Sequence, residues 1–270
     1  KIALWALVDA NADSLSFFEV DQARRDLAGW PRPAKRQLAA EKLLETSGQS
    51  PQAVIAWFGG AQPQTAEGAM ALASAYQQTG KGAEAQALIR DFWRNKSFEV
   101  GPQRSMLARF GSWLTADDHI RRADILLYGA QGPAAREMVT LVPADHQQLA
   151  RARIALRAGS AEGNTLAGGL PAHLAGHPGL AFERAGFYRK KGLDTLALEQ
   201  VRAMPREAPY AEMADRIWDI RYPLVLSSLR NGDHQGAYAA AANSGLTSGG
   251  DAADAEFYAG WIALTKLRNP

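Results

Sequence analysis

Apolar side chains recur along this chain with the spacing of a helix rather than that of a strand. Leu72 and Tyr76 lie four residues apart, and after a turn Leu88 and Phe92 repeat the interval. Almost no segment alternates with a period of two, and Ala, Leu, Arg, Gln and Glu dominate the periodic windows. The pattern predicts an all-α protein of roughly 13 to 15 short helices. Pro and Gly punctuate these helices at 31–33, 59–63, 80–82, 101–102, 129–133, 168–171, 176–179, 192, 205–209, 231–232 and 245–250.

A glycine followed five residues later by an alanine occurs in four similar stretches. They read “TGKGAEAQAL”, “YGAQGPAARE”, “KGLDTLALEQ” and “NGDHQGAYAA”, with the pairs Gly80 and Ala85, Gly129 and Ala134, Gly192 and Ala197, and Gly232 and Ala237. We expect each glycine to close a helix in the left-handed conformation, and each small alanine to let the next helix pack closely on the one before. A weaker fifth copy at Gly159 has Asn164 in the alanine position.

The glycines of these five turns are 49, 30, 33 and 40 residues apart, which is irregular but centred on the size of a helical hairpin. The stretch “AMALASAYQQTGKGAEAQALIRDFW” is similar to a tetratricopeptide hairpin. Such hairpins cannot bury their apolar faces alone. The sequence therefore predicts a tetratricopeptide-like solenoid, an αα-superhelix that forms a single domain over residues 1–270. A globular bundle with coincidental glycine spacing is the alternative.

Charge and composition exclude several classes of protein. The 30 Lys and Arg residues and 28 Asp and Glu residues give a net charge of +2, which is too balanced for a dedicated nucleic-acid binder. No run of 18 apolar residues occurs, so we expect no transmembrane segment. The apolar start “KIALWALVDA” meets Asp9 after eight residues, which predicts a core helix and not a signal peptide. The absence of cysteine excludes disulfides, Cys-ligated zinc and thiol nucleophiles.

Motifs assign no catalytic, cofactor or metal residue to this chain. The P-loop pattern GxxxxGK[ST], the zinc motif HExxH and the nucleophile elbow GxSxG are all absent. His173 and His177 are four residues apart and could share one face of a helix. Gly176 and Pro178 break that segment, so we expect a loop there rather than a metal site.

Two acidic clusters are predicted to serve the starts of helices. Asp117 and Asp118 directly precede His119. This order would suit a catalytic base, His119, that is oriented by a neighbouring carboxylate. The simpler interpretation is that Thr115 caps a helix whose positive end the two Asp residues favour. The second cluster lies around the start of the last helix, where capping and dipole compensation explain it. It consists of Asp251, Asp254 and Glu256.

Basic side chains cluster near predicted helix C-termini, and two interpretations stay open. The simpler one is a solvated face that satisfies the helix dipole. The other is a groove that attracts an acidic polymer. The candidate contacts for such a polymer are Arg184, Arg189, Lys190 and Lys191 in “ERAGFYRKKG”, with Arg151, Arg153 and Arg157 one repeat earlier. The seven Trp residues are spread along the chain, which indicates packing between helices rather than a platform for sugars.

Several stretches resemble the superhelical N-terminal region of soluble peptidoglycan lytic transglycosylases. “YRKKGLDTLA” is similar to that family’s “YRRKGLDxxA” hairpin, which a Trp-bearing helix follows, here around Trp218. “GDHQGAYAAAANSGL” and “DAEFYAGWIALTKLRNP” are similar to its “GDYxxAYxLAxxHGL” hairpin and “DAEWLAGWIALRFLxDP” helix. “LARFGSWLTADDHIRRADILLYG” resembles its “FxxxLTxEDHxxRxDxLLW” segment. The resemblance is good over 105–270 and loose over 1–100. These motifs specify packing and identify no active residue.

The resemblance implies a periplasmic location and contact with the glycan strands of peptidoglycan, without a cofactor. In this family the chain continues into a lysozyme-like domain. Its catalytic glutamate, usually in a Glu-Ser dipeptide, cleaves the bond between N-acetylmuramic acid and N-acetylglucosamine with closure of an anhydro ring. None of the 13 Glu residues here is followed by Ser, so this chain alone is predicted to be inactive. The rival hypothesis is a helical-repeat scaffold that binds a partner protein in its concave groove.

Overall fold

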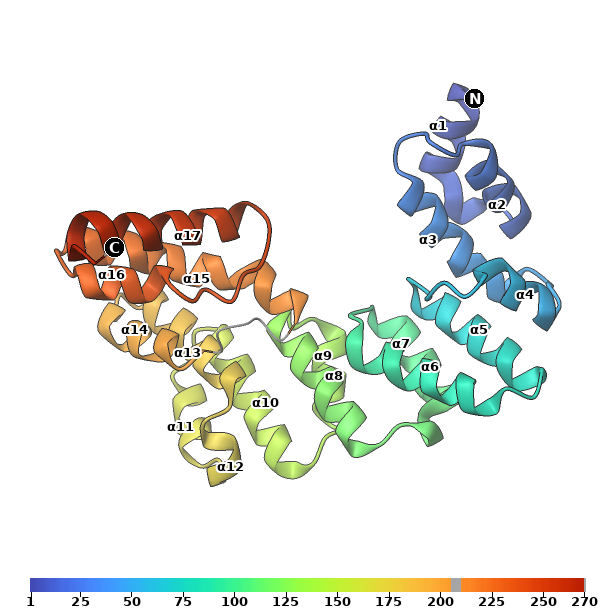
Figure 1. Ribbon diagram of the computed structural model, residues 1–270. Coiled ribbons are helices and arrows are strands. Elements are labelled where there is room, and N and C mark those ends of the chain that lie inside the picture. Colours follow the sequence, from blue (N-terminus) through green and yellow to red (C-terminus); the bar gives the residue numbers. More distant parts are fainter. Residues whose placement is uncertain (205–209, 270) are drawn as a thin grey trace. The chain divides into compact units, whose positions relative to one another are not determined.

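The computed structural model describes residues 1–204 and 210–269 and consists there of helices joined by turns and loops (Figure 1). Within those residues the chain forms seventeen α-helices and no strand, which confirms the predicted all-α class. The helices outnumber the prediction because short ones, such as α12 (Ala172–Ala175), lie where we expected loops. The predicted break at 205–209 and the end of the chain at Pro270 lie outside the described residues.

The chain divides into two compact units, Lys1–Asp118 and His119–Pro270. Helix α8 (Ala116–Tyr128) begins in the first unit and continues in the second. A separate cluster of buried apolar side chains lies in each unit. The single domain predicted for residues 1–270 stays a prediction.

The first unit packs short helices against their neighbours in the sequence. They are α1 (Ile2–Asn11), α2 (Phe17–Asp26), α3 (Pro33–Leu43), α4 (Pro51–Phe58), α5 (Ala66–Gln78), α6 (Gly82–Asn95) and α7 (Val100–Phe110). Helix α2 packs on α3, α4 on α5, and α5 on α6. The predicted core helix α1 buries Val8 but leaves Ile2 and Leu7 exposed, because the unit covers only one face of it.

Two buried charged side chains hold helix ends inside the first unit. Arg36 of α3 donates hydrogen bonds to the carbonyl oxygens of Leu27 at 3.2 Å and Trp30 at 3.1 Å, just beyond the C-terminal end of α2. Glu41 of the same helix accepts a hydrogen bond of 2.8 Å from the backbone N–H of Thr65, which precedes α5. Both contacts satisfy backbone groups that a helix end leaves without an intrahelical partner.

The second unit is a series of helical hairpins. Besides α8 and α12 it contains α9 (Pro133–Met138), α10 (Ala144–Arg157), α11 (Glu162–Gly168), α13 (Pro178–Lys190), α14 (Asp194–Arg202), α15 (Ala211–Arg230), α16 (His234–Ala241) and α17 (Gly250–Ile262). Helix α10 pairs with α11, α13 with α14, and α15 with α16. Neighbouring hairpins touch through α10 and α13, and through α13 and α15. Helix α17 packs on α16 and α15, and a π-helical turn at Ala263–Leu267 follows it.

The left-handed glycines predicted at the turns occur in all but one copy. Gly80, Gly192 and Gly232 have φ values of 78°, 71° and 73°, and Gly159 of the fifth copy has 83°. In the second copy the left-handed residue is Gln131, with φ of 54°, so the prediction for Gly129 is wrong. The turn after α8 closes later than expected because it leads into Pro133, the first residue of α9.

Small residues stand where the helices of a hairpin approach most closely. The predicted alanines are buried at all four places, Ala85, Ala134, Ala197 and Ala237. In the fifth copy the contact falls on Gly163 rather than Asn164. A Cβ atom on Gly163 would lie 2.6 Å from Leu156 Cγ and 2.8 Å from the carbonyl oxygen of Ala152, both in α10. The weak fifth copy is therefore a hairpin whose contact residue is displaced by one position.

We expect Gly163→Ala to destabilise the protein by about 1–3 kcal/mol, because the added methyl group overlaps the backbone of α10. Gly168→Ala, at the other end of α11, is the matched control. A Cβ atom there meets nothing within 4 Å, so the change should be neutral or stabilise by up to about 1 kcal/mol. Urea denaturation followed by circular dichroism measures both. Equal effects of the two substitutions would contradict the close approach at Gly163.

Candidate functional site: a charged cleft beside helix α13

A cleft with a volume of about 200 Å³ lies in the second unit, lined by residues of α10, α13 and α15. Leu156, Phe182 and Ile220 supply apolar lining. The charged lining residues are Arg157, Glu183, Arg189, Lys190, Arg216 and Asp219. Four of these side chains are cationic and two are anionic, so the cleft carries an excess of positive charge and favours an anionic ligand.

Glu183 and Arg157 form the buried centre of the cleft wall. Arg157 Nε donates a hydrogen bond of 2.6 Å to Glu183 Oε2, and Arg157 Nη2 donates a second bond to Oε1. Gln131 Nε2 donates to the same Oε1 at 3.1 Å. Burial raises the pKa of the Glu183 carboxyl above its ordinary value, whereas the hydrogen bonds and charge of Arg157 act to lower it. Arg157 is therefore what allows a carboxylate to lie inside this helix packing.

Arg157 and Arg216 also close the C-terminal end of α8. Arg157 Nη1 donates to the carbonyl oxygen of Gly129 at 2.7 Å, and Arg216 Nη1 donates to the same oxygen at 2.6 Å. Arg216 also reaches the carbonyl oxygen of Tyr128 at 3.2 Å. A helix C-terminus presents free carbonyls and a negative dipole end, which cations satisfy. Arg157 and Arg216, two of the three arginines of the cleft, therefore have a structural role.

Arg189 and Lys190 are the cations of the cleft that remain available to a ligand. Neither forms an ion pair within the described residues, and Arg189 Nε is enclosed without a hydrogen-bond partner there. Lys190 is exposed, and its charge acts to lower the pKa of Glu183. The sequence predicted both residues as polymer contacts, and the structure brings them to one cleft.

The other two predicted contacts, Arg184 and Lys191, lie outside the cleft lining. Arg184 Nε donates a hydrogen bond of 3.2 Å to Asn164 Oδ1, which ties α13 to α11. Lys191 Nζ lies 5.8 Å from the centroid of the Phe187 ring. The four cations are adjacent in sequence, but helical rotation points them in different directions.

A buried network beside the cleft was not foreseen from the sequence. Arg153 of α10, predicted for a solvated face, has only 1% of its surface exposed. It pairs with Asp124 of α8, and its guanidinium carbon lies 4.5 Å from the centroid of the Tyr128 ring. Burial alone would lower the pKa of Arg153, but the charge of Asp124 keeps it above its ordinary value. The solvated-face interpretation is wrong for Arg153 because α13 packs over it, with Gly179 leaving the space.

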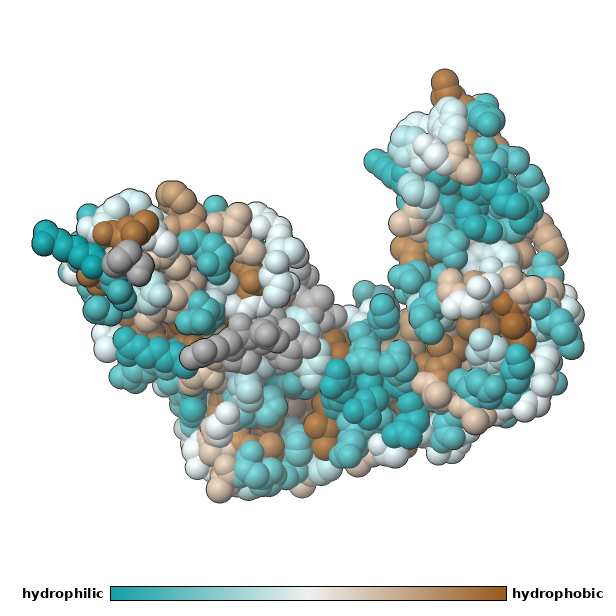
Figure 2. Space-filling view, viewed as in Figure 1, coloured by the Kyte–Doolittle hydropathy of each residue, from teal (hydrophilic) through white to brown (hydrophobic). Residues whose placement is uncertain are grey.

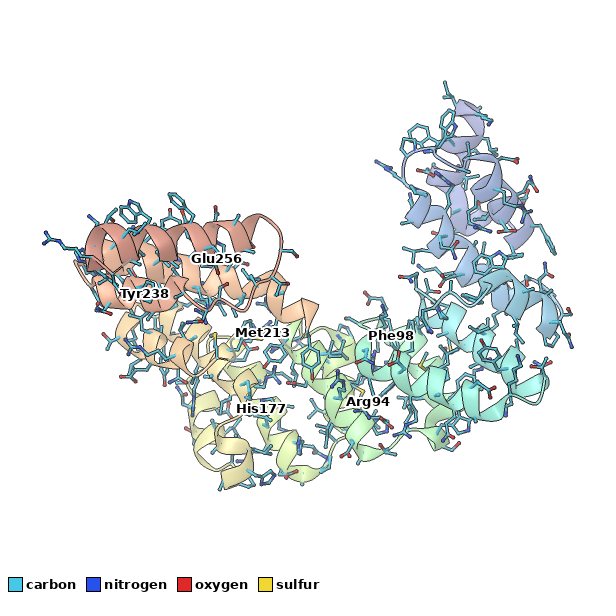
Figure 3. All side chains as sticks on the ribbon, viewed as in Figure 1. Arg94, Phe98, His177, Met213, Tyr238 and Glu256 are labelled. Atoms are coloured by element: carbon cyan, nitrogen blue, oxygen red, sulfur yellow. The ribbon has the colours of Figure 1, made fainter. Side chains whose placement is uncertain are left out.

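The histidine pair of “HLAGHP” separates in the structure. His177 lies at the start of α13, where its Nδ1 accepts a hydrogen bond of 3.1 Å from the backbone N–H of Gly179 (Figure 3). His173 Nε2 lies 3.1 Å from Asp145 Oδ2 at the start of α10. The two imidazoles therefore contact different carboxylates, since His177 Nε2 is 4.0 Å from Asp124 Oδ1. His177 is a helix cap and not half of a metal site.

The predicted cap at Thr115 is confirmed. Thr115 Oγ1 accepts a hydrogen bond of 3.3 Å from the backbone N–H of Asp118, and Asp118 Oδ2 accepts one of 2.8 Å from the backbone N–H of Thr115. Arg90 Nε also donates to Asp118 Oδ2 at 3.1 Å. Burial acts to raise the pKa of Asp118, but the hydrogen bonds from Thr115 and Arg90 hold it below its ordinary value. Asp118 is a structural anion that pairs α8 with α6.

The acidic cluster in α17 places a carboxylate near the positive end of the helix dipole but does not cap the helix. The residue that caps α17 is Gly249, and no side chain accepts a hydrogen bond there. Asp251 lies in the first turn, where a negative charge is favourable. The capping role predicted for this cluster is therefore not seen. Its three members, Asp251, Asp254 and Glu256, are exposed.

No family model, curated protein or solved structure matches this chain. Over the residues that the structure describes, no group of three His, Cys, Asp or Glu side chains is placed to hold a metal ion. None of the helices described combines the length and apolar character that crossing a membrane requires.

We expect Arg157→Leu to lower the free energy of unfolding by about 3–5 kcal/mol, because it leaves Glu183 buried without its partner. Arg151→Leu, on the exposed side of the same helix, should change it by no more than about 0.5 kcal/mol. The double variant Arg157→Leu with Glu183→Leu should recover part of the loss. Chemical denaturation of the three variants measures these differences. If Arg157→Leu destabilised the protein no more than Arg151→Leu does, Arg157 would not be the residue that stabilises the buried Glu183 carboxylate.

Stability should fall as the pH drops through about 6.5, in part because of His177. Burial lowers the pKa of His177 below its ordinary value, with the charge of Asp124 opposing and that of Arg153 assisting. The unfolded chain therefore binds this proton more readily than the folded chain, and acid favours unfolding. His177→Asn keeps an oxygen that can cap α13 and should flatten the pH dependence between about pH 5 and 7.

Denaturation midpoints of wild type and His177→Asn at several pH values measure this effect. The slope should differ by at most about 1.4 kcal/mol per pH unit, the value for a single proton. His234→Asn, on α16, controls for the loss of a histidine elsewhere. Parallel pH profiles for wild type and His177→Asn would show that His177 has no part in the dependence.

Proposed function

We propose that this chain is the superhelical, non-catalytic domain of a periplasmic peptidoglycan lytic transglycosylase. Its role is to hold glycan strands beside a catalytic module that cleaves the bond between N-acetylmuramic acid and N-acetylglucosamine. The proposal rests on the family-like motifs over 105–270 and on one structural observation. Two of the four predicted polymer contacts, Arg189 and Lys190, line a cleft with excess positive charge and form no ion pair within the described residues.

The chemistry of the cleft suits an acidic polymer. Peptidoglycan carries carboxylates on its peptide parts, and its sugar rings present apolar faces. Arg189 and Lys190 supply charge for the carboxylates, next to a cleft wall that includes the apolar side chains of Phe187 and Ile220. Arg157 and Arg216 are held by α8 carbonyls and so fix the shape of the wall rather than move with a ligand.

A superhelical, tetratricopeptide-like arrangement of the hairpins is part of the proposal. The order of packing supports it, because α10 touches α13 and α13 touches α15, one hairpin after the next. The buried alanines at the turns support it as well, since they permit the close spacing that stacked hairpins need. A row of hairpins offers an extended surface, which suits a polymer better than a small metabolite.

The second candidate function, a scaffold for a partner protein, is favoured by a groove in the first unit. This groove has a volume of about 340 Å³ and is lined by Tyr76, Glu84 and Asp91 over a floor that includes Leu72 and Leu88. Its charge is negative, opposite to that of the cleft beside α13. An acidic groove with an aromatic side chain suits a basic peptide segment and repels an acidic polymer.

Binding to purified peptidoglycan sacculi tests the first proposal. We expect weak, salt-sensitive binding that the double variant Arg189→Glu with Lys190→Glu reduces about tenfold, because two positive charges become negative. Arg184→Glu, on the same helix but outside the cleft, is the matched control and should bind like wild type. A sedimentation assay with sacculi measures binding, and circular dichroism confirms that each variant is folded.

The chain alone should release no anhydromuropeptides from sacculi, and liquid chromatography with mass spectrometry would detect any product. Absence of sacculus binding, with selective capture of one protein that Glu84→Lys and Asp91→Lys abolish, would replace the first proposal by the second. Equal loss of sacculus binding in the cleft variant and the Arg184→Glu control would exclude the cleft as the site.

A further inference from the structure

Helix α17 and the turn after it carry an exposed apolar stripe. Phe257 and Leu264 have 64% and 61% of their surface exposed, and Trp261 between them has 36%. Single exposed apolar residues are common on protein surfaces, but aligned ones mark an interface. Figure 2 shows hydrophobic surface at this end of the molecule, where Figure 1 places α17 at the outer edge of the second unit.

The stripe has the form of a surface for packing against another helix. Its residues recur at intervals of three and four, so they lie on one face of the helix opposite the buried Ala255 and Ile262. Gly260 lies within the stripe, and a Cβ atom there would meet nothing within 4 Å. A neighbouring helix could therefore approach the backbone closely at this point. Trp261 was expected to pack between helices, and it has no such cover within the described residues.

Charges along this segment divide by sign. The first half carries exposed carboxylates, and Asp254 is the one beside the apolar stripe. The end carries exposed cations, Lys266 and Arg268. Lys266 Nζ lies 5.3 Å from the centroid of the Trp261 ring, so its positive charge is held beside the stripe. The segment is acidic at one end and basic at the other, which makes it complementary to an antiparallel copy of itself.

We propose that α17 forms a two-fold symmetric, antiparallel contact with α17 of a second copy of this chain. An axis passing between Gly260 and Trp261 pairs residues whose numbers add to 521. Phe257 then lies opposite Leu264 of the second copy, and Trp261 lies opposite Gly260 of the second copy. Asp254 comes next to Lys266 of the second copy. One register therefore fills the space over glycine, covers all three apolar side chains and joins opposite charges.

The contact is expected to be weak. A large aromatic side chain buries about 150–250 Å², so the exposed parts of these three side chains amount to about 300 Å² in each copy. Both copies together reach about 600 Å² from the stripe, below the roughly 1,200 Å² of stable interfaces. We expect a dissociation constant of about 0.1 mM, with monomers at low concentration and dimers at high concentration.

Sedimentation equilibrium of this chain between about 5 and 500 µM measures the association. Wild type should convert from monomer to dimer across this range. Phe257→Ser should raise the dissociation constant about tenfold, because it removes the most exposed apolar side chain of the stripe and its contact with Leu264 of the second copy. Phe18→Ser is the matched control, since Phe18 is 58% exposed but belongs to α2 in the other unit, and it should leave the constant unchanged.

Charge reversal tests the antiparallel register separately from apolar contact. Asp254→Lys and Lys266→Asp should each weaken the dimer several-fold, and the double variant should restore it. A chain that stays monomeric at the highest concentration overturns the proposal. So does a dimer that survives Phe257→Ser with Leu264→Ser, or a double charge variant no tighter than the single ones. These measurements do not involve sacculus binding, so the proposed dimer and the proposed function are tested independently of each other.

Discussion

This fold depends on buried and half-buried arginines that donate hydrogen bonds to the carbonyl oxygens at the ends of neighbouring helices. Short helices expose many end groups relative to their length, and hairpin packing brings those ends close to apolar surface. An arginine can satisfy several carbonyls at once because its guanidinium has five donors in one plane. Such arginine hydrogen bonds occur at the C-terminal end of α2 in the first unit and of α8 and α16 in the second. The arginines are Arg36, Arg157, Arg216 and Arg221.

Each buried guanidinium needs an anion or enough carbonyls to offset its desolvation. Among the described residues Arg221 donates only to carbonyl oxygens, including that of Ala240 at 3.0 Å, and burial lowers its pKa to about 10, so it remains charged at neutral pH. Arg157 relies on Glu183 as well, which anchors α13 against α10 and α8. Because α13 is fixed in this way, Arg189 and Lys190 line the cleft while Arg184 faces α11. The charges that line the candidate site are thus set by the same arginine hydrogen bonds that satisfy the carbonyl oxygens at helix ends.

The two proposals concern different kinds of surface on the second unit. The cleft beside α13 is charged, and two of its cations, Arg189 and Lys190, form no ion pair with the residues that the structure describes, which fits a flexible acidic polymer held by electrostatic attraction. The stripe on α17 is apolar and regular, with an open glycine at its centre, which fits a rigid helix held by shape. No group among the described residues has the arrangement of a metal site, and the perturbed pKa values belong to residues such as Glu183 and Arg153 with packing roles.

Amino-acid order alone determined the helices, their turns and the small residues at the hairpin contacts. These features depend on interactions within about five residues, such as the left-handed Gly192 followed by the buried Ala197. The exception at Gly129 arose because a proline further on set where the next helix starts. Only the tertiary structure decided which basic residues are buried. Arg153 and Arg157 look like solvent-facing cations in sequence, and nothing local reveals their carboxylate partners. Asp124 lies 29 residues before Arg153 and Glu183 lies 26 residues after Arg157, so each pair forms only once hairpins have packed.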